Sequence, residues 1–252
     1  DHLMPRVHEA GEKILVADGT NAHPHRGIAT LTYVINGQAD HNDSNGHHAL
    51  VRSGGVQWMK AGSGIIHDES FNVDDNSGNP LTHGLQFWIN LPSKNKAERP
   101  DYIPLTASEV PEKQLEDGGW IKVIAGEFED LTSKIPGYTK QFIYHIHLEA
   151  GKRFSFQSME GLEYAILLPV AGAVIDNKMY SKDDVISLDK RGSILELGAD
   201  ANESTDIILF GGEHYSEPVV SYGPFVMNTE HEISEAYNDF YQGKYGQINY
   251  AN

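Results

Sequence analysis

Short apolar stretches, many of them with alternating side chains, recur along the whole chain and stop at turn signals. Examples are segments 29–35, 85–91, 121–124, 141–148, 162–170 and 207–210, most of them followed closely by proline or glycine. Within segment 29–35 neighbouring side chains fall on opposite faces, as in a half-buried strand. Many short strands at this spacing predict an all-β fold of sandwich or barrel type.

The chain of 252 residues is long enough for two compact domains. Segment 128–139 lies between two strand-rich halves and carries acidic residues together with Pro136 and Gly137. We place a domain boundary there, with an N-terminal domain of residues 1–131 and a C-terminal domain of residues 132–252.

One amphipathic helix is expected near the C-terminus. Thr229 and Glu232 have the spacing of a capping box, and Gly243 is a suitable stop signal. Between them an apolar stripe at helical spacing is formed by Ile233, Ala236, Tyr237 and Phe240. Such a stripe indicates a packing face, so we interpret the helix as structural.

The composition excludes several classes of function. Cysteine is absent, which removes thiolate metal sites and disulfides. The formal net charge of −17 repels phosphate, so we expect no direct nucleic-acid binding. Without a long apolar run we expect no membrane partner and a cytoplasmic location. The first residue is Asp1, so we expect the chain to be trimmed. The 13 histidines are the first indication of metal chemistry.

Two pairs of potential ligands recur at strand spacing. His23 and His25 flank Pro24, and His67 and Glu69 form a second pair 42 residues after His25. In an extended chain the side chains at i and i+2 point to the same side. A lone His-x-His pair is more often a surface or core feature than a binding site. Two such strands side by side, however, supply three nitrogens and one oxygen to a shared metal.

This donor set narrows the choice of metal without deciding it. Imidazole suits iron, copper, nickel and zinc, whereas Mg²⁺ or Ca²⁺ prefers a mostly carboxylate shell. Four protein ligands leave open positions on an octahedral ion, where O₂ or a chelating substrate can bind.

The sequence resembles the pirin family. The resemblance rests on the His-Pro-His-Arg-Gly segment and on further blocks that cover most of the N-terminal half and the C-terminal tail. These blocks are residues 23–27, 31–33, 40–46, 55–67, 83–92 and 223–229.

The resemblance implies a bicupin, which consists of two cupin-type β-barrels, here followed by a short C-terminal helix. It implies iron (with Cu, Ni, Zn or Mn as alternatives) held by His23, His25, His67 and Glu69 in the first barrel, and a second barrel without metal. Family members usually have Phe-Glu where this chain has Ile28-Ala29. That Glu is not a ligand in pirins, so we expect only the pocket wall to change. We also expect the chain to lack the family's opening strand or strands, because Asp1 lies close to the first ligand.

Several other residues are candidates for a role at the site. We predict that Gln86, Trp88 and Trp58 line a substrate pocket, with core packing as the alternative for the two tryptophans. His83 is either a residue that orients a ligand or a structural histidine. His41, His47 and His48 surround an Asn-Gly turn and are expected to be solvated. His145 and His147 invite a second metal, but no completing ligands follow, and we expect them on the less buried strand face.

Two functions follow from the resemblance. The first is a quercetin 2,3-dioxygenase-type oxygenase, in which Glu69 is the catalytic base and a flavonol-like small molecule and O₂ are the partners. The second is a non-enzymatic, iron-dependent transcriptional cofactor or redox-sensing regulator that binds a protein partner. A nuclear-localisation-like cluster of basic residues is lacking, which weakens the second hypothesis.

Overall fold

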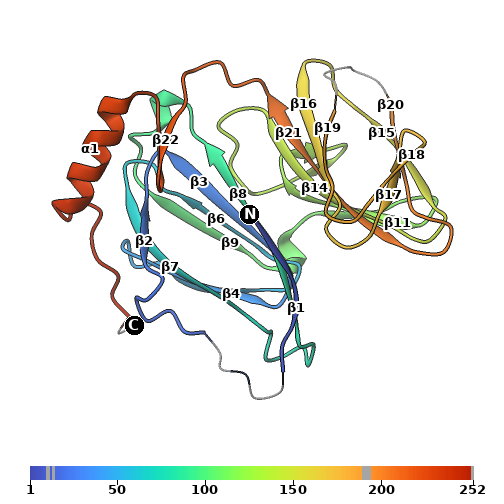
Figure 1. Ribbon diagram of the computed structural model, residues 1–252, viewed down its shortest axis with the longest axis horizontal. Helices are drawn as coiled ribbons and strands as arrows, with labels where there is room; N and C mark the ends of the chain where they lie inside the picture. The colour runs from blue at the N-terminus through green and yellow to red at the C-terminus, as the bar shows by residue number, and fades with distance from the viewer. Residues whose placement is uncertain (10–11, 13–14, 189–193, 251–252) are drawn as a thin grey trace. The chain divides into compact units, whose positions relative to one another are not determined.

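The computed structural model describes residues 1–9, 12, 15–188 and 194–250 (Figure 1). Contacts between Cα atoms divide the chain into two compact units. The first unit consists of Asp1–Glu109 and Ser216–Asn252, and the second consists of Val110–Tyr215.

The first unit is built on a five-stranded antiparallel sheet. In spatial order its strands are β1 (His2–Val7), β8 (Leu81–Asn90), β3 (Ile28–Asn36), β6 (Val56–Lys60) and β9 (Asp101–Leu105). The central strand β3 is buried on both faces over its first seven residues, so it is more buried than the half-buried strand that its alternating residues predict. Two 3₁₀ turns, η1 (Ser93–Asn95) and η2 (Ala107–Glu109), flank β9.

A four-stranded antiparallel sheet faces the first one. Its order is β2 (His23–His25), β7 (Ile65–Asn72), β4 (Gln38–Asp43) and β5 (His48–Arg52). Tyr102 of β9 stacks on His41 of β4 at a ring separation of 4.1 Å, so side chains of the two sheets meet. The interior between these two sheets contains the candidate site.

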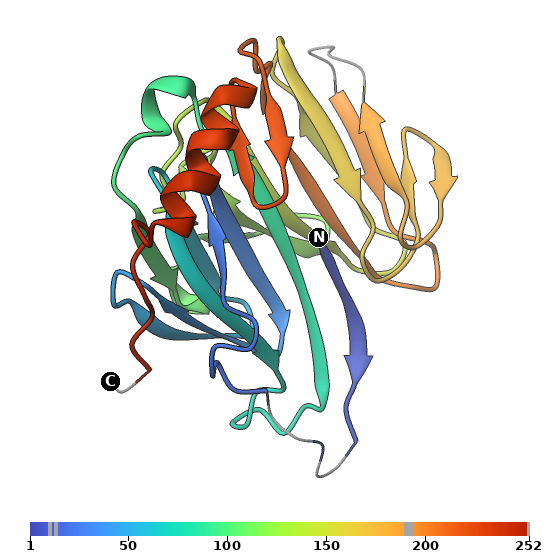
Figure 2. The ribbon, with the colours of Figure 1, turned by 60° about the vertical axis from the view of Figure 1, so that its left-hand side comes forward.

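The C-terminal segment completes the first unit. It contains the hairpin β22 (Val220–Tyr222) and β23 (Phe225–Met227), followed by α1 (Glu230–Tyr241), which lies alongside the strands of the unit (Figure 2). The side chain of Thr229 accepts a hydrogen bond from the Glu232 N–H, which confirms the capping prediction. Ile233 and Ala236 are buried against Phe225, so the predicted apolar stripe is the packing face.

The second unit also consists of two facing sheets with a shared apolar core. The six-stranded sheet has the order β10 (Glu112–Gln114), β11 (Gly119–Ala125), β14 (Gln141–Leu148), β21 (Thr205–Glu213), β16 (Leu162–Leu167) and β19 (Val185–Leu188). The four-stranded sheet has the order β15 (Arg153–Gln157), β20 (Ile194–Gly198), β17 (Ala173–Ile175) and β18 (Lys178–Tyr180). A short hairpin joins β12 (Glu127–Phe128) to β13 (Leu131–Thr132).

The all-β fold with a C-terminal helix agrees with the prediction, but the division of the chain differs from the expected one. Residue 131 lies in β13 of the second unit, and α1 packs on β23 of the first. The turn-rich segment 128–139 begins within the β12–β13 hairpin of the second unit. Local turn signals do not distinguish such a hairpin from a linker. In the described part of the chain, no helix is long and apolar enough to cross a membrane.

Candidate metal centre

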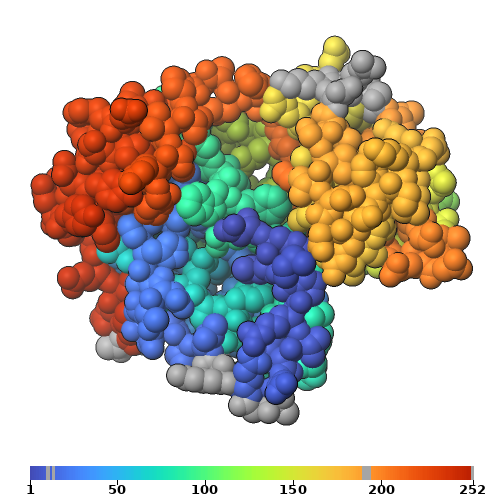
Figure 3. Space-filling model, viewed as in Figure 1, coloured from blue at the N-terminus to red at the C-terminus, as the bar shows by residue number. Residues whose placement is uncertain are grey.

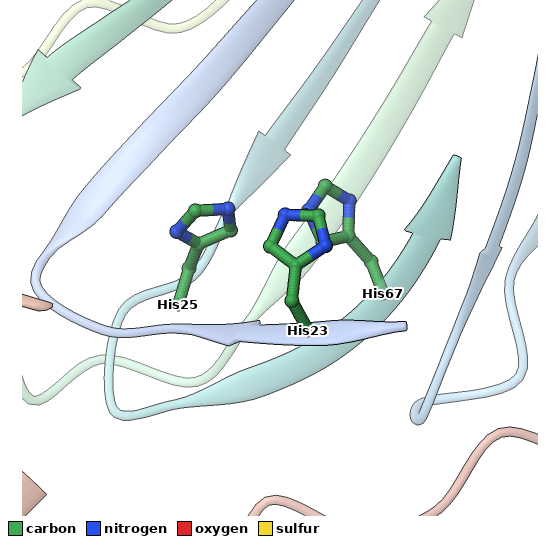
Figure 4. Close-up of side chains that lie close together, drawn as sticks. All are labelled: His23, His25 and His67. Carbon is green, nitrogen blue, oxygen red and sulfur yellow. The ribbon is translucent and has the colours of Figure 1, made fainter. Parts of the chain in front are cut away.

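Three imidazoles meet on two neighbouring strands of the first unit. In the antiparallel pairing of β2 and β7, His23 stands directly opposite His67, and Pro24 keeps β2 extended. His25 projects to the same side as His23, as the two-residue period requires (Figure 4). The three ring centroids are 4.4–5.0 Å apart, and the Nε2 atoms of His23 and His67 are separated by 3.0 Å.

Backbone carbonyls set the orientation of two of these rings. The Nδ1 atom of His23 donates to the Asn21 carbonyl at 2.8 Å, and Nδ1 of His25 donates to the Pro224 carbonyl at 3.1 Å. With the proton held on Nδ1, Nε2 carries the lone pair and is free to bind a metal. The C-terminal segment thus orients a ligand that is 199 residues away in the sequence.

Burial keeps two of the imidazoles neutral. The pKa of His25 is lowered to about 4, mainly by burial and secondarily by the neighbouring His23. Burial also holds the pKa of His67 well below its ordinary value, although the charge of Glu69 opposes this shift. Neutral imidazole is the form that coordinates metals, so both rings are ready to bind at neutral pH.

Glu69 lies on the far side of His67 from the other two histidines. Gln57 donates to its Oε1 at 2.6 Å, and Gln86 donates to its Oε2 at 2.8 Å. Burial alone would raise the pKa of Glu69, but His67 and the neighbouring donors lower it to about 2. The carboxylate is therefore ionised and held at both oxygens. Its nearest potential ligand partners are His67 and His41, rather than His23 and His25.

The position of His41 differs from the prediction. The sequence analysis expected it to be solvated beside a turn, but it is fully buried and stacks on Tyr102 with an interplanar angle of 7°. Its Nε2 atom lies 3.2 Å from Asp43 Oδ2, and its Nδ1 atom lies 3.9 Å from Glu69 Oε1. The turn itself is at the surface, but β4 carries His41 back into the space between the sheets.

The three predicted pocket residues have different environments. Gln86 reaches the site through Glu69, while Trp88 is 43% exposed and its ring lies edge-on to His25 at 4.9 Å. Trp58, by contrast, is 1% exposed and follows Gln57 on β6, so it points to the opposite face of the sheet. The core-packing alternative therefore describes Trp58, and its assignment to the pocket is corrected. The first unit is hollowed between its N-terminal segments (Figure 3).

The remaining candidate histidines have structural partners. The Nε2 atoms of His83 and His2 are within hydrogen-bond distance at 2.9 Å, so His83 joins β8 to β1. In the second unit, His145 and His147 both contact Oδ1 of Asp206, at 2.8 and 3.0 Å. His145 is 3% exposed and His147 is half-buried, and they lie on the less buried of the two faces of β14, as expected. Both faces of β14 are covered.

The segment that carries the first two ligands is anchored by the C-terminal part of the unit. Arg26 forms an ion pair with Asp239 of α1 at 2.8 Å. The buried Lys96 ammonium donates to the carbonyls of Gly27 and Val226, both at 2.8 Å. Sequence reasoning missed this role of Lys96, because only the tertiary structure brings the two carbonyls together.

Family models of known proteins match both halves of the chain. The family model described as Pirin matches residues 1–89, and the model described as Pirin C-terminal cupin domain matches residues 143–246. A pirin-like protein of Arabidopsis thaliana is 37% identical over 227 residues, which cover 86% of this chain and 72% of that protein. The chain belongs to the pirin family.

Solved structures extend the likeness to the whole fold of this pirin-family chain. A quercetin 2,3-dioxygenase from Acinetobacter baumannii superimposes with a TM-score of 0.88 at 30% identity, covering 98% of this chain and 85% of that one. A bacterial pirin from Escherichia coli, solved in complex with nickel(II), has a TM-score of 0.61 at 21% identity, covering 84% and 81%. Like its bicupin neighbours, this chain consists of two units of paired sheets.

The residues of the site fit a metal ion. Three imidazole nitrogens converge on one point, two of them with their second nitrogen tied to a carbonyl, and an ionised carboxylate lies next to the third ring. Such a nitrogen-rich set with one carboxylate suits a transition metal.

Proposed function

We propose that this chain is an iron-dependent oxygenase of the quercetin 2,3-dioxygenase type. The observation that carries the proposal is the convergence of His23, His25 and His67 beside the ionised Glu69. Iron is the metal that the family resemblance implies, while the donor set would also accept Cu, Ni, Zn or Mn. The likeness to a solved quercetin 2,3-dioxygenase supports a flavonol as substrate and O₂ as co-substrate.

The three histidines would hold the ion, with Glu69 as the fourth ligand. When bound, the metal supplies Lewis-acid chelation of the flavonol 3-hydroxyl and 4-carbonyl oxygens and a position for O₂. Glu69 is ionised, because its pKa is lowered to about 2, so it is in the proton-accepting form. It would take the proton of the 3-hydroxyl on a carboxylate oxygen, as a general base. Gln57 and Gln86 keep that carboxylate in place.

Trp88 provides a surface for the organic part of the substrate. Its half-exposed indole stands beside His25, and the Nε1–H lies 3.4 Å from Gln86 Oε1. A flavonol has flat aromatic rings, and aromatic side chains bind such rings by offset stacking or edge contacts. We therefore propose that Trp88 packs against the substrate and that Gln86 lines the same wall.

Protein purified without added metal, stripped and reloaded with Fe(II), would test the proposal. We expect aerobic loss of quercetin with matching O₂ uptake and release of carbon monoxide. His23→Ala should remove activity and weaken iron binding, and Glu69→Gln should remove activity more severely than metal. His231→Ala is the matched control, because this histidine is exposed on α1.

Two results would contradict the proposal. If protein with full iron content leaves quercetin unchanged, the oxygenase proposal is wrong and a non-enzymatic metal-dependent role gains support. If the protein binds no transition metal at all, the assignment of the four ligands is also wrong.

A further inference from the structure

His67 faces two different groups with its two ring nitrogens. On one side Nε2 lies 3.0 Å from Nε2 of His23. On the other side Nδ1 is buried without a hydrogen-bond partner and lies 3.7 Å from Oε2 of Glu69. A buried imidazole nitrogen normally has a partner, so this nitrogen is unusual.

His41 repeats the arrangement from the neighbouring strand. Its Nε2 is bound to Asp43, and its Nδ1 is buried without a hydrogen-bond partner, 3.9 Å from Oε1 of Glu69. Because the carboxylate of Asp43 accepts a hydrogen bond, the ring proton belongs on Nε2 and the lone pair on Nδ1. A carboxylate bound to the remote nitrogen is the arrangement that orients metal-ligating histidines.

The distances favour a shared cation over a hydrogen bond. A direct N–H···O bond would bring nitrogen and oxygen to about 2.7–3.2 Å. Two donor atoms that each lie about 2.1 Å from one ion are instead roughly 3.0–4.2 Å apart, depending on the angle at the ion. The observed separations from Glu69 to His67 and His41, 3.7 and 3.9 Å, lie in the second range.

We propose that His41, His67 and Glu69 form a second cation position, which we call the inner position. It deepens the metal-binding part of the proposed function, because it shares His67 with the outer position formed by His23 and His25. A neutral imidazole has one lone pair, which His67 offers either through Nε2 to the outer position or through Nδ1 to the inner one. A single ion therefore alternates between the two positions, and His67 is common to both.

Neighbouring side chains hold two of the inner ligands, His41 and Glu69, in position. Tyr102 stacks on His41 and donates a hydrogen bond to Gln57, which in turn donates to Glu69. The inner position has two nitrogens and one carboxylate, whereas the outer has three nitrogens. Ions that prefer oxygen ligands, such as Mn²⁺, will favour the inner position, and Ni²⁺ or Cu²⁺ will favour the outer.

Cobalt(II) titration of the metal-free full chain tests this inference. In the double variant His23→Ala/His25→Ala, only the inner position is complete, and we expect one Co²⁺ per chain to remain bound. Adding His41→Phe should then weaken binding by at least about tenfold. Phenylalanine retains the stacking on Tyr102 and removes the nitrogen. If the double variant binds no Co²⁺, or binds it equally with and without His41→Phe, the inference is wrong.

Pulsed EPR of the Cu²⁺-loaded protein gives a second readout that does not depend on His41→Phe folding. We expect three coordinated imidazoles in the wild type and two in the double variant. A count of one or none in the double variant would overturn the inner position. The wild type would still bind metal in that case, so this failure differs from failure of the proposed oxygenase site.

Discussion

His23 and His67 are paired face to face across β2 and β7, with their Nε2 atoms 3.0 Å apart. This single pairing joins two segments that are 44 residues apart and creates the core of the metal centre. The other ring nitrogen of His67, Nδ1, lies 3.7 Å from Oε2 of Glu69. Several expected outcomes follow from that position and from the groups that support it.

His67→Ala should reduce metal binding more than His25→Ala, because His67 belongs to both groups of potential ligands among the described residues, whereas His25 belongs to one. His25→Ala should leave partial binding. Metal content per chain after dialysis against Co²⁺ measures the difference, with His231→Ala as the control. Equal losses in the two site variants would contradict the central role of His67.

Gln57→Leu should weaken metal binding by about 10–100-fold, the range seen when groups that support a ligand are lost. The substitution removes the donor to Oε1 of Glu69 and leaves the ligands themselves unchanged. Gln114→Leu, at an exposed position of β10, is the control. Unchanged Co²⁺ affinity in Gln57→Leu would show that Glu69 does not need this support.

Lys96→Met should lower the free energy of unfolding by about 2 kcal/mol, because the Val226 carbonyl and Asn90 Oδ1 lose a buried donor, while the Gly27 carbonyl still accepts from the Leu91 N–H. The carbonyl of Pro224 lies two residues from Val226, so the orientation of His25 should be disturbed as well. Urea unfolding and Co²⁺ titration measure the two effects. Lys94→Met, at an exposed position, should change neither.

The metal-free protein should lose stability as the pH falls from about 6.5 to about 4. Burial lowers the pKa of His25 from 6.5 to about 4, so the unfolded chain takes up a proton before the folded one does. Stability is fully present above pH 6.5 and is lost on the way to pH 4, by about 3 kcal/mol from this residue. Urea unfolding at several pH values in this range should show that the free energy of unfolding depends less on pH in His25→Leu than in the wild type. A wild type with the same curve as the variant would exclude this contribution.

The local parts of the fold were predictable because they depend on neighbouring residues. The two-residue strand period placed His23 and His25 on one side, and the capping spacing of Thr229 and Glu232 located the start of α1. The family blocks then identified the bicupin fold. These predictions agree with the structure because short-range geometry does not depend on which strands become neighbours.

Tertiary structure decided the rest of the site. The sequence alone established the strands, the family and the four expected ligands, but strand pairing decided that Glu69 lies nearer His41 than His25. Strand pairing also decided that Trp58 is buried in the core while Gln57 faces the site. Neighbouring residues of a strand point to opposite faces, so a shift of one residue reverses this arrangement. The carbonyl of Pro224 reaches His25 only through folding of the C-terminal segment. Contacts over such sequence distances depend on packing and leave no local pattern.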